Sequence, residues 1–373
     1  MNVPKLRFKE FSDEWISKKL FQLVEFSKGN ILAKADLAET GNYPCILYGQ
    51  LYTKYNEVIR KIYSKTNRNE NNIPKSKKGD VLIPSSGETP IDISTSSCIQ
   101  IDNVLLGGDI NILRPISCDG RFLSYLINNN KKTEIAKVAQ GHSVVHLYND
   151  NLKQVSINIP SIQEQKRISD TLELLDKKIE LQTKKIEDLK LFKKGLSTTI
   201  FNSLRDFEEY KLGKICNITT GKLDANAMID NGKYRFYTCA KEYSLIDKYA
   251  FDTEALLISG NGAYVGYIHY YKGKFNAYQR TYVLDNFSQN IQFIKCYLEE
   301  NLAKRINSEK KEGNTPYIVL STLSDMVIKI PSKENQIKIS NIINCHNKKI
   351  ELEENKLLKL QEFKKGLMQS MFV

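Results

Sequence analysis

The sequence predicts an α+β fold class, with two pseudo-repeated mixed αβ domains separated by two long antiparallel coiled-coil helices. The first observation is that the pentapeptide FKKGL occurs twice, at 192–196 and at 363–367. The second is that the segments around both copies have a helical apolar periodicity, whereas the segments before them contain short β-branched and aromatic runs. The third is length, because 373 residues exceed one ordinary core and suit two domains.

Residues 1–160 are expected to form the first domain. Short apolar runs bounded by Gly, Pro or Asn, such as LFQLVEFSKG at 20–29 and DVLIPSS at 80–86, have the composition of strands. The interval 60–80 contains seven basic residues, two acidic residues and four Asn. A stretch of this composition is either a solvated loop or a loop that lies against phosphates, with Asn and Arg available for base edges.

Residues 161–202 are expected to form the first long helix. Pro160 and Ser161 supply a start signal, because proline disfavours helix before it and serine caps the first turn. Apolar residues then recur in a 3-4 alternation that is interrupted at Gln182, which is typical of a coiled-coil seam. The predicted seam residues are Ile168, Leu172, Leu175, Ile179, Ile186, Leu189 and Leu196.

Residues 203–331 are expected to form the second domain, because short segments of the first domain return there in the same order. The segment at 20–29 resembles 212–221, and 80–86 resembles 254–260. Two further pairs complete the set, 41–48 with 232–239 and 152–160 with 323–331. A helical stretch, FIKCYLEENLAKRI at 293–306, interrupts the predicted strands.

Residues 332–373 are expected to form the second long helix. Residues 160–201 align without gaps on residues 331–372, with 18 identities in 42 positions, which is an internal duplication. The seam residues of this copy are Ile339, Ile343, Ile350, Leu357, Leu360 and Leu367. A helix of roughly 37 residues is about 55 Å long at 1.5 Å per residue. Two such helices most simply pack together antiparallel, and the alternative is a pair of amphipathic helices on separate domains.

Gln182 and Glu353 interrupt the two seams at the same repeat position. One interpretation is an exposed flank position at which polarity costs nothing. The other is a polar group at the interface that disfavours shifted pairings of the helices.

Composition restricts the class of protein. The net charge of +12 favours a polyanionic partner, and the charge is spread over the whole chain. No run of about 18 apolar residues exists, so we expect no membrane span. The charged start, MNVPKLRFKEF, does not resemble a signal peptide, and the seven scattered Cys indicate reduced thiols in a cytoplasmic protein.

Motifs that would carry catalysis were sought along the whole sequence. It contains no N-P-P-[FYW] or D-P-P-[YFW] tetrapeptide of the amino-methyltransferase type and no P-loop. The glycines of SGNGAYVG at 259–266 precede a strand pattern and not a helix, so they indicate a turn. His142 and His146 lack further metal ligands at a suitable spacing. We therefore predict no catalytic, cofactor-binding or metal residues.

The order and spacing of three motifs resemble the specificity subunit of type I restriction-modification enzymes. These motifs are the opening PKLRF…EW…KKL, the two P-S-x-x-x-Q-x-x-I helix starts and the two KKI…FKKGL helices. The resemblance covers essentially the whole chain. It implies a non-catalytic DNA reader in which each domain is a target recognition domain for one half of a bipartite double-stranded DNA sequence.

The resemblance also implies the partners. The paired helices would space the two domains and dock methyltransferase subunits, of which two are expected, and restriction-translocase subunits would join them. S-adenosylmethionine, ATP and Mg²⁺ are expected on those partners, and no cofactor is expected on this chain.

DNA-contacting residues are predicted from residue type and from position in loops that follow strands, because the resemblance carries over no individual base-reading residue. Lysines would meet phosphates, whereas Arg280 and the amides could reach base edges. The candidates in the first domain are Lys75, Lys77, Lys78, Ser85, Ser86, Gln140, His142 and Ser143. Those in the second are Asn261, Tyr264, Gln279, Arg280, Asn314, Thr315 and Tyr317.

Two other classes of function stay open at this point. One is a diverged DNA methyltransferase-related enzyme, which would modify DNA with S-adenosylmethionine in the absence of partners. The other is a coiled-coil scaffold that joins proteins and has no DNA specificity, which a gel-shift measurement at stated salt would identify.

Overall fold

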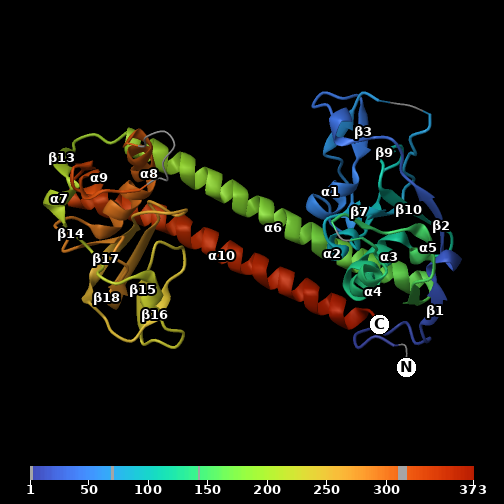
Figure 1. Cartoon of the computed structure of the whole chain (residues 1–373). Helices are drawn as coiled ribbons and strands as arrows, with labels where there is room; N and C mark the ends of the chain where they lie inside the picture. The colour runs from blue at the N-terminus through green and yellow to red at the C-terminus, as the bar shows by residue number, and fades with distance from the viewer. Residues whose placement is uncertain (1–2, 69–70, 142, 310–316) are drawn as a thin grey trace. The chain divides into compact units, whose positions relative to one another are not determined.

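The computed structural model describes residues 3–68, 71–141, 143–309 and 317–373. It divides into two compact units, one formed by residues 1–183 with 356–373 and the other by residues 184–355. The predicted α+β class is confirmed, with two mixed domains and two long antiparallel helices (Figure 1). Three of the predicted DNA-contacting residues, His142, Asn314 and Thr315, lie outside the described residues.

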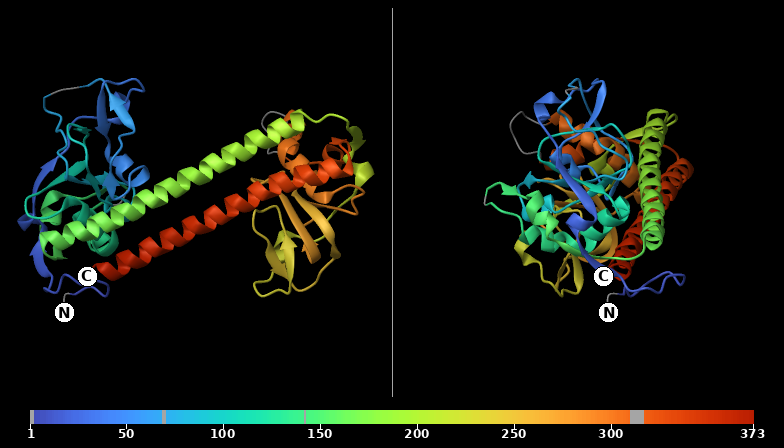
Figure 2. Two further views of the ribbon diagram at one scale, coloured as in Figure 1. Left: turned by 180° about the vertical axis from the view of Figure 1, so that it is seen from behind. Right: turned by 90° about the vertical axis from the view of Figure 1, so that its right-hand side faces the viewer.

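The two long helices are α6 (Ile162–Asn202) and α10 (Lys333–Met371). Each is an unbroken ribbon in every view (Figure 2). Both begin just after a Pro-Ser pair, whose serine hydroxyl accepts a hydrogen bond from the backbone N–H three residues later. Each unit contains the start of one helix and the end of the other, so the pairing is antiparallel.

The first unit is built on a five-stranded sheet in the order β2-β10-β6-β8-β4, with a three-stranded sheet β5-β3-β9 and two strand pairs, β1-β12 and β11-β7. Its strands are β1 (Ile16–Lys19), β2 (Val24–Lys28), β3 (Tyr43–Ile46), β4 (Val58–Ile59), β5 (Ser64–Thr66), β6 (Val81–Pro84), β7 (Ser86–Gly87), β8 (Ser97–Ile99), β9 (Leu105–Leu106), β10 (Ile110–Pro115), β11 (Val145–His146) and β12 (Ser156–Ile159). Its shorter helices are α1 (Tyr48–Thr53), α2 (Pro90–Ile93), α3 (Gly120–Leu126), α4 (Lys132–Lys137) and α5 (Asn149–Lys153).

The core of the first unit is made from both ends of the chain. Trp15 packs edge-on against Phe122 of α3 with ring centroids 5.7 Å apart, and Phe122 contacts Phe372 at 5.4 Å. Ile168 and Leu172 of α6 belong to the same buried cluster. The backbone N–H of Leu6 also donates to the carbonyl of Ser370 at 2.9 Å, which joins the N-terminal segment to the end of α10.

The second unit is built on one six-stranded sheet in the order β14-β19-β17-β18-β15-β16, with the separate pair β13-β20. Its strands are β13 (Glu208–Lys211), β14 (Asn217–Thr220), β15 (Tyr234–Tyr237), β16 (Ser244–Ile246), β17 (Phe251–Ser259), β18 (Ile268–Ala277), β19 (Thr281–Asp285) and β20 (Val327–Ile330). Its shorter helices are α7 (Leu212–Ile215), α8 (Ile291–Glu309) and α9 (Leu320–Ser324). Phe201 of α6 and Ile343 of α10 join its core.

The backbone ladders show that the two domains are structural repeats. Ile16 pairs with Ile159 in the first unit, and Glu208 pairs with Ile330 in the second. The backbone N–H of Gly29 donates to Ile110, and that of Gly221 donates to Thr281. The match of 20–29 with 212–221 therefore has the register that the sequence indicates.

One predicted match is displaced by a residue. Aligning 80–86 on 254–260 places Ser85 over Ser259. In the structure the N–H of Ser85 donates to the carbonyl of Asp109 at 2.7 Å, and the equivalent donor to Arg280 is Gly260 at 2.9 Å. Ser85 therefore corresponds to Gly260. Few side chains distinguish two registers of such short strands, and the hydrogen-bonded ladder selects between them.

None of the thirteen predicted seam residues is exposed. Residues near the helix ends, such as Ile168 and Ile343, are part of the domain cores. Glu353 is only 6% exposed, and its carboxylate pairs with Lys185 of the other helix at 2.9 Å. Of the two interpretations of this position, the structure thus supports a polar group at the interface for Glu353, while Gln182 is half-buried. Among the described helices, none has the length and apolar character that crossing a membrane requires.

Candidate nucleic-acid interface

In both units, four connecting segments meet at one end of the main sheet, which we call the loop end. In the first unit it comprises residues 46–50, 84–87, 107–110 and 146–148. In the second unit it comprises residues 237–241, 259–262, 278–281 and 317–319. Matched hydrogen bonds define the correspondence: the N–H of Gly107 donates to Ile46 and that of Tyr278 donates to Tyr237, both at 2.9 Å. The N–H of Leu147 donates to Ser85, and that of Ile318 donates to Gly260.

The turn after β17 presents aromatic and amide groups at the second loop end. Gly262 and Gly266 adopt φ values of +79° and +82°, which side chains with a Cβ rarely adopt, so the turn between them depends on glycine. Tyr264 is 43% exposed, and the ammonium of Lys241 lies 5.4 Å from its ring centroid. Asn261 forms a backbone bridge with Tyr317, which is 60% exposed. Exposed rings of this kind can stack on bases.

The turn before β19 presents a side-chain amide and a guanidinium at this loop end. Gln279 is exposed, and its side-chain amide donates to Asp224 at 2.6 Å. Arg280 is exposed, and its guanidinium makes no hydrogen bond or ion pair with any described residue. All five of the described second-domain candidates, Asn261, Tyr264, Gln279, Arg280 and Tyr317, therefore lie at one end of one sheet.

The first-domain candidates divide into two groups. Gln140 and Ser143 are exposed on a hairpin closed by backbone hydrogen bonds between Gln140 and His146 at 2.9 and 2.7 Å. Strand β11 attaches this hairpin to β7 at the loop end. Ser85 and Ser86 are only 2% and 5% exposed, so they are buried within the loop end and do not face solvent.

Lys75, Lys77 and Lys78 are all exposed. Lys77 and Lys78 precede β6, at the opposite end of that strand from Ser85, whereas Lys75 forms a backbone bridge with Leu105 of β9, two residues before Gly107. The N–H of Lys77 donates to Asp80, and the N–H of Lys78 donates to Asp102, which fixes the turn before the strand. A four-residue strand is about 13 Å long. The structure therefore places Lys77 and Lys78 away from the strand end to which the 140–146 hairpin is attached.

Asp109 is a residue of the first loop end that the sequence reasoning missed. It occupies the position of Arg280, since the two carbonyls accept the equivalent bonds from Ser85 and Gly260. A groove of about 790 Å³ lies beside it, lined by apolar side chains and by Lys34 and Lys54. The sequence contains a signal for this equivalence. GGDINIL at 107–113 aligns with YQRTYVL at 278–284 at the same 171-residue offset as the two long helices, which places Asp109 over Arg280.

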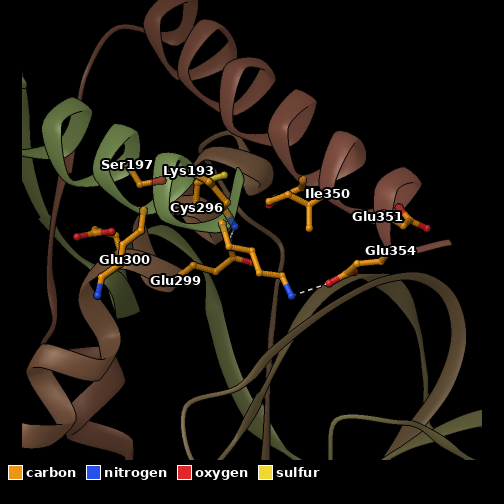
Figure 3. A pocket seen from close by; sticks show the side chains of 11 residues that line it. Lys193, Ser197, Cys296, Glu299, Glu300, Ile350, Glu351 and Glu354 are labelled. Carbon is orange, nitrogen blue, oxygen red and sulfur yellow. Dashed lines mark ion pairs between the residues drawn. The ribbon is translucent and has the colours of Figure 1, made fainter. Parts of the chain in front are cut away.

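A second hollow, of about 430 Å³, lies in the second unit between α6, α8 and α10. Figure 3 shows Lys193, Cys296, Glu299 and Ile350 around it. The ammonium of Lys193 is 3.7 Å from the carboxylate of Glu299, and Lys190 pairs with Glu354 at 2.6 Å.

The equivalent place in the first unit is filled. Tyr125, Asp176 and Lys364 stand where the second unit has Cys296, Asn347 and Lys193. The hydroxyl of Tyr125 donates to Asp176 at 2.5 Å, and Lys364 pairs with Asp176 at 2.6 Å and with Glu57 at 3.0 Å. Burial raises the pKa of Asp176 although Lys364 opposes the shift, so this carboxyl group is buried at an energetic cost.

Within the described ranges, no group of three His, Cys, Asp or Glu side chains is placed to hold a metal ion. The loop ends instead offer amides, a free guanidinium, a carboxylate and exposed tyrosines. Such groups recognise donors, acceptors and flat faces of bases, and the neighbouring lysines attract phosphates.

Comparisons with known proteins give a consistent result. A family model described as the type I restriction modification DNA specificity domain matches residues 12–191 and again residues 205–362. The type I restriction enzyme EcoDI specificity subunit of Escherichia coli is 35% identical over 165 residues, which span 44% of this chain but only 36% of that subunit. A Mycoplasma pneumoniae protein provisionally named as a type I specificity subunit is 24% identical over 99% of both chains.

A solved structure has the same fold. The type I restriction-modification S subunit from M. genitalium superposes with a TM-score of 0.72 and covers 100% of this chain and 99% of that chain. The two sequences are 19% identical, so this likeness concerns the fold alone.

Proposed function

Because the chain belongs to the type I restriction modification DNA specificity family, we propose that it reads a bipartite double-stranded DNA target, with one domain on each half-site. The observation that carries this proposal is the pair of matched loop ends. Their backbone hydrogen bonds are equivalent, whereas their exposed side chains differ, as Asp109 and Arg280 illustrate. Two frames with the same backbone hydrogen bonds but different side chains suit two half-sites of different sequence.

We further propose that the chain is a non-catalytic subunit that binds two methyltransferase subunits, one for each copy of the duplicated helix. The duplication supports this number, since equivalent surfaces accept equivalent partners. S-adenosylmethionine would then be bound by the methyltransferase subunits, and ATP with Mg²⁺ by restriction-translocase subunits. Such a complex would act in the cytoplasm, where its DNA substrate lies.

The test is to map methylated adenines in cells that express the methyltransferase subunits with and without this chain. We expect a bipartite motif with an unspecified spacer only when the chain is present. A purified chain that transfers labelled methyl groups to DNA on its own would identify a diverged methyltransferase instead. A chain that binds its partners but shifts no DNA in a gel, with and without those partners, would identify a scaffold.

A further inference from the structure

We propose, on the basis of the function proposed above, that Asp109 and Arg280 are the equivalent base-reading side chains of the two domains. Asp109 would accept a hydrogen bond from the exocyclic amine of a cytosine in one half-site. Arg280 would donate to N7 and O6 of a guanine in the other half-site. These pairings follow from the donors and acceptors that each base presents in the major groove.

The two residues are equivalent by backbone hydrogen bonding and strand register, although Asp109 has a positive φ and Arg280 does not. The carbonyl of Asp109 accepts from Ser85 at 2.7 Å, and the carbonyl of Arg280 accepts from Gly260 at 2.9 Å. The residue after each one begins the strand that lies second from the edge of its main sheet, and Ile110 pairs with Pro84 as Thr281 pairs with Ser259. One position of the strand ladder thus carries opposite charges in the two domains. A structural requirement common to both domains would not produce this difference.

Arg280 combines a fixed backbone with an unoccupied side chain. Its carbonyl accepts from the thiol of Cys239 at 3.4 Å as well as from Gly260. Its guanidinium makes no hydrogen bond or ion pair with any described residue and is exposed. An unpaired guanidinium on a rigid turn loses little freedom on binding and presents a planar pair of donors.

Asp109 is held in a strained turn beside a groove. It adopts φ +58°, and nearby Ile31 adopts φ +48°, which is a rare conformation for a β-branched residue. The two turns are linked, because the N–H of Gly108 donates to the carbonyl of Leu32 at 3.3 Å. Strain of this kind persists where the surroundings impose it and is concentrated at binding sites.

The surroundings of Asp109 favour an amine as its partner. Its Oδ1 accepts a long bond of 3.4 Å from the hydroxyl of Ser85, and no described residue donates to its Oδ2. Lys34 and Lys54 line the same groove and can offset repulsion between the carboxylate and DNA phosphates. A carboxylate that faces DNA is repelled by hydrogen-bond acceptors on base edges and accepts hydrogen bonds from exocyclic amines. It therefore discriminates between bases.

The experiment maps methylated adenines in cells that express the full-length chain, wild type or variant, with its methyltransferase subunits. For Asp109→Asn we expect the preferred base at one position of one half-site to change from cytosine to adenine, because asparagine suits adenine. For Arg280→Gln we expect a change from guanine to adenine at one position of the other half-site. Each change should reduce the preference for the original base by at least about tenfold.

Controls separate reading from folding. Asp206→Asn and Arg205→Gln repeat the same substitutions at exposed residues outside the loop ends and outside the two long helices, and we expect both to keep the parental motif. Asp109→Gly retains access to positive φ without the carboxylate, so it should relax one position of the motif without unfolding the domain. Thermal unfolding of each purified chain verifies that the variants are folded.

The outcomes distinguish this inference from the proposed function. A wild-type chain that directs no bipartite methylation would overturn the proposed function. A wild-type bipartite motif that persists unchanged in folded Asp109→Asn and Arg280→Gln variants would overturn the inference alone. Methylation that is weakened equally at all sequences, with base preferences unchanged, would mean that the two residues contact phosphates or support the fold. That result would also overturn the inference.

Discussion

Gln165 and Gln336 attach the start of each long helix to its own domain. Both side chains are 1% exposed. The amide of Gln165 donates to the carbonyl of Pro160, and its oxygen accepts from the N–H of Asp119, both at 2.9 Å. Gln336 makes the equivalent bonds with Pro331 and Asn290. Since Asp119 and Asn290 cap α3 and α8, each glutamine joins two helix starts.

Replacing Gln165 by Leu should lower the free energy of unfolding by about 1–3 kcal/mol, because the buried N–H of Asp119 and carbonyl of Pro160 lose their partner. Urea denaturation of the purified chain measures the change. Gln163→Leu is the matched control on the same helix turn, where the side chain is exposed. Equal effects of the two substitutions would show that the buried bonds contribute nothing.

His269 makes the stability of the second unit dependent on pH. Partial burial lowers its pKa below the usual 6.5, although a hydrogen bond to the carbonyl of Ala240 opposes the shift. The unfolded chain therefore binds a proton more readily than the folded one. The contribution of His269 to stability is present above pH 6.5 and is lost as pH falls through the lower folded pKa.

We expect the loss of stability between pH 7.5 and pH 5.5 to be smaller for His269→Gln than for the wild type. Glutamine retains a donor for Ala240 and does not titrate. Chemical denaturation at the two pH values measures the free energy of unfolding of each protein. The contributions of the carboxylates cancel in the comparison, because both proteins contain the same carboxylates. A wild type and variant with the same pH dependence would remove His269 from this role.

At the scale of elements, the two copies of the helix junction differ in how they are filled. In the first unit the hydroxyl of Tyr125 of α3 donates to the carboxylate of Asp176 of α6, which also pairs with Lys364 of α10. In the second unit Cys296 of α8 and Asn347 of α10 leave the hollow of about 430 Å³ (Figure 3). Because the backbones are repeats, the side chains of the filled junction should fit the open one.

The double substitution Cys296→Tyr with Asn347→Asp should therefore raise the free energy of unfolding by about 0.5–2 kcal/mol, which is typical of cavity filling. Differential scanning calorimetry would show a higher melting temperature. Cys345→Tyr is the control, since this cysteine is exposed on α10, the helix that contains Asn347, and its replacement should have little effect. Destabilisation by the double substitution would mean that the hollow of the second unit has a different shape from its filled counterpart.

At the scale of the whole molecule, α6 and α10 are each continuous across the boundary between the two units. A continuous helix transmits a change in its length, and four residues add about 6 Å. If the helices set the spacing of the half-sites, inserting four residues after both Gln182 and Glu353 should lengthen the unspecified spacer by one or two base pairs, at about 3.4 Å each.

Mapping methylated adenines directed by the insertion variant tests this prediction. The control is an insertion of four residues after Asp230, in an exposed turn of the second domain, which should leave the spacer unchanged. A helix-insertion variant that is folded, methylates DNA and keeps the parental spacer would show that something other than helix length determines the spacing.

Part of the candidate site followed from residue type and neighbourhood. Asn261, Tyr264 and Arg280 were predicted because they flank strand ends, and turns at strand ends are exposed and rich in such residues. The same reasoning included Lys77 and passed over Asp109. Lys77 was included for its charge but precedes β6, at the opposite end of that strand from Ser85. Asp109 was overlooked because a carboxylate does not suggest DNA binding. Neither position can be assigned without the strand pairing.

The duplication, the two long helices and the mixed character of the domains could be inferred from sequence, because repeats and helical periodicity are local patterns that need no knowledge of distant partners. The equivalence of Ser85 with Gly260, and hence of Asp109 with Arg280, depended on the tertiary structure. Strand register is decided by hydrogen bonds between segments far apart in the chain, and a one-residue shift leaves almost no trace in a short apolar run. The composition of the first unit's core also depended on the tertiary structure, because Phe372 packs against Phe122 although the two residues are far apart in the sequence.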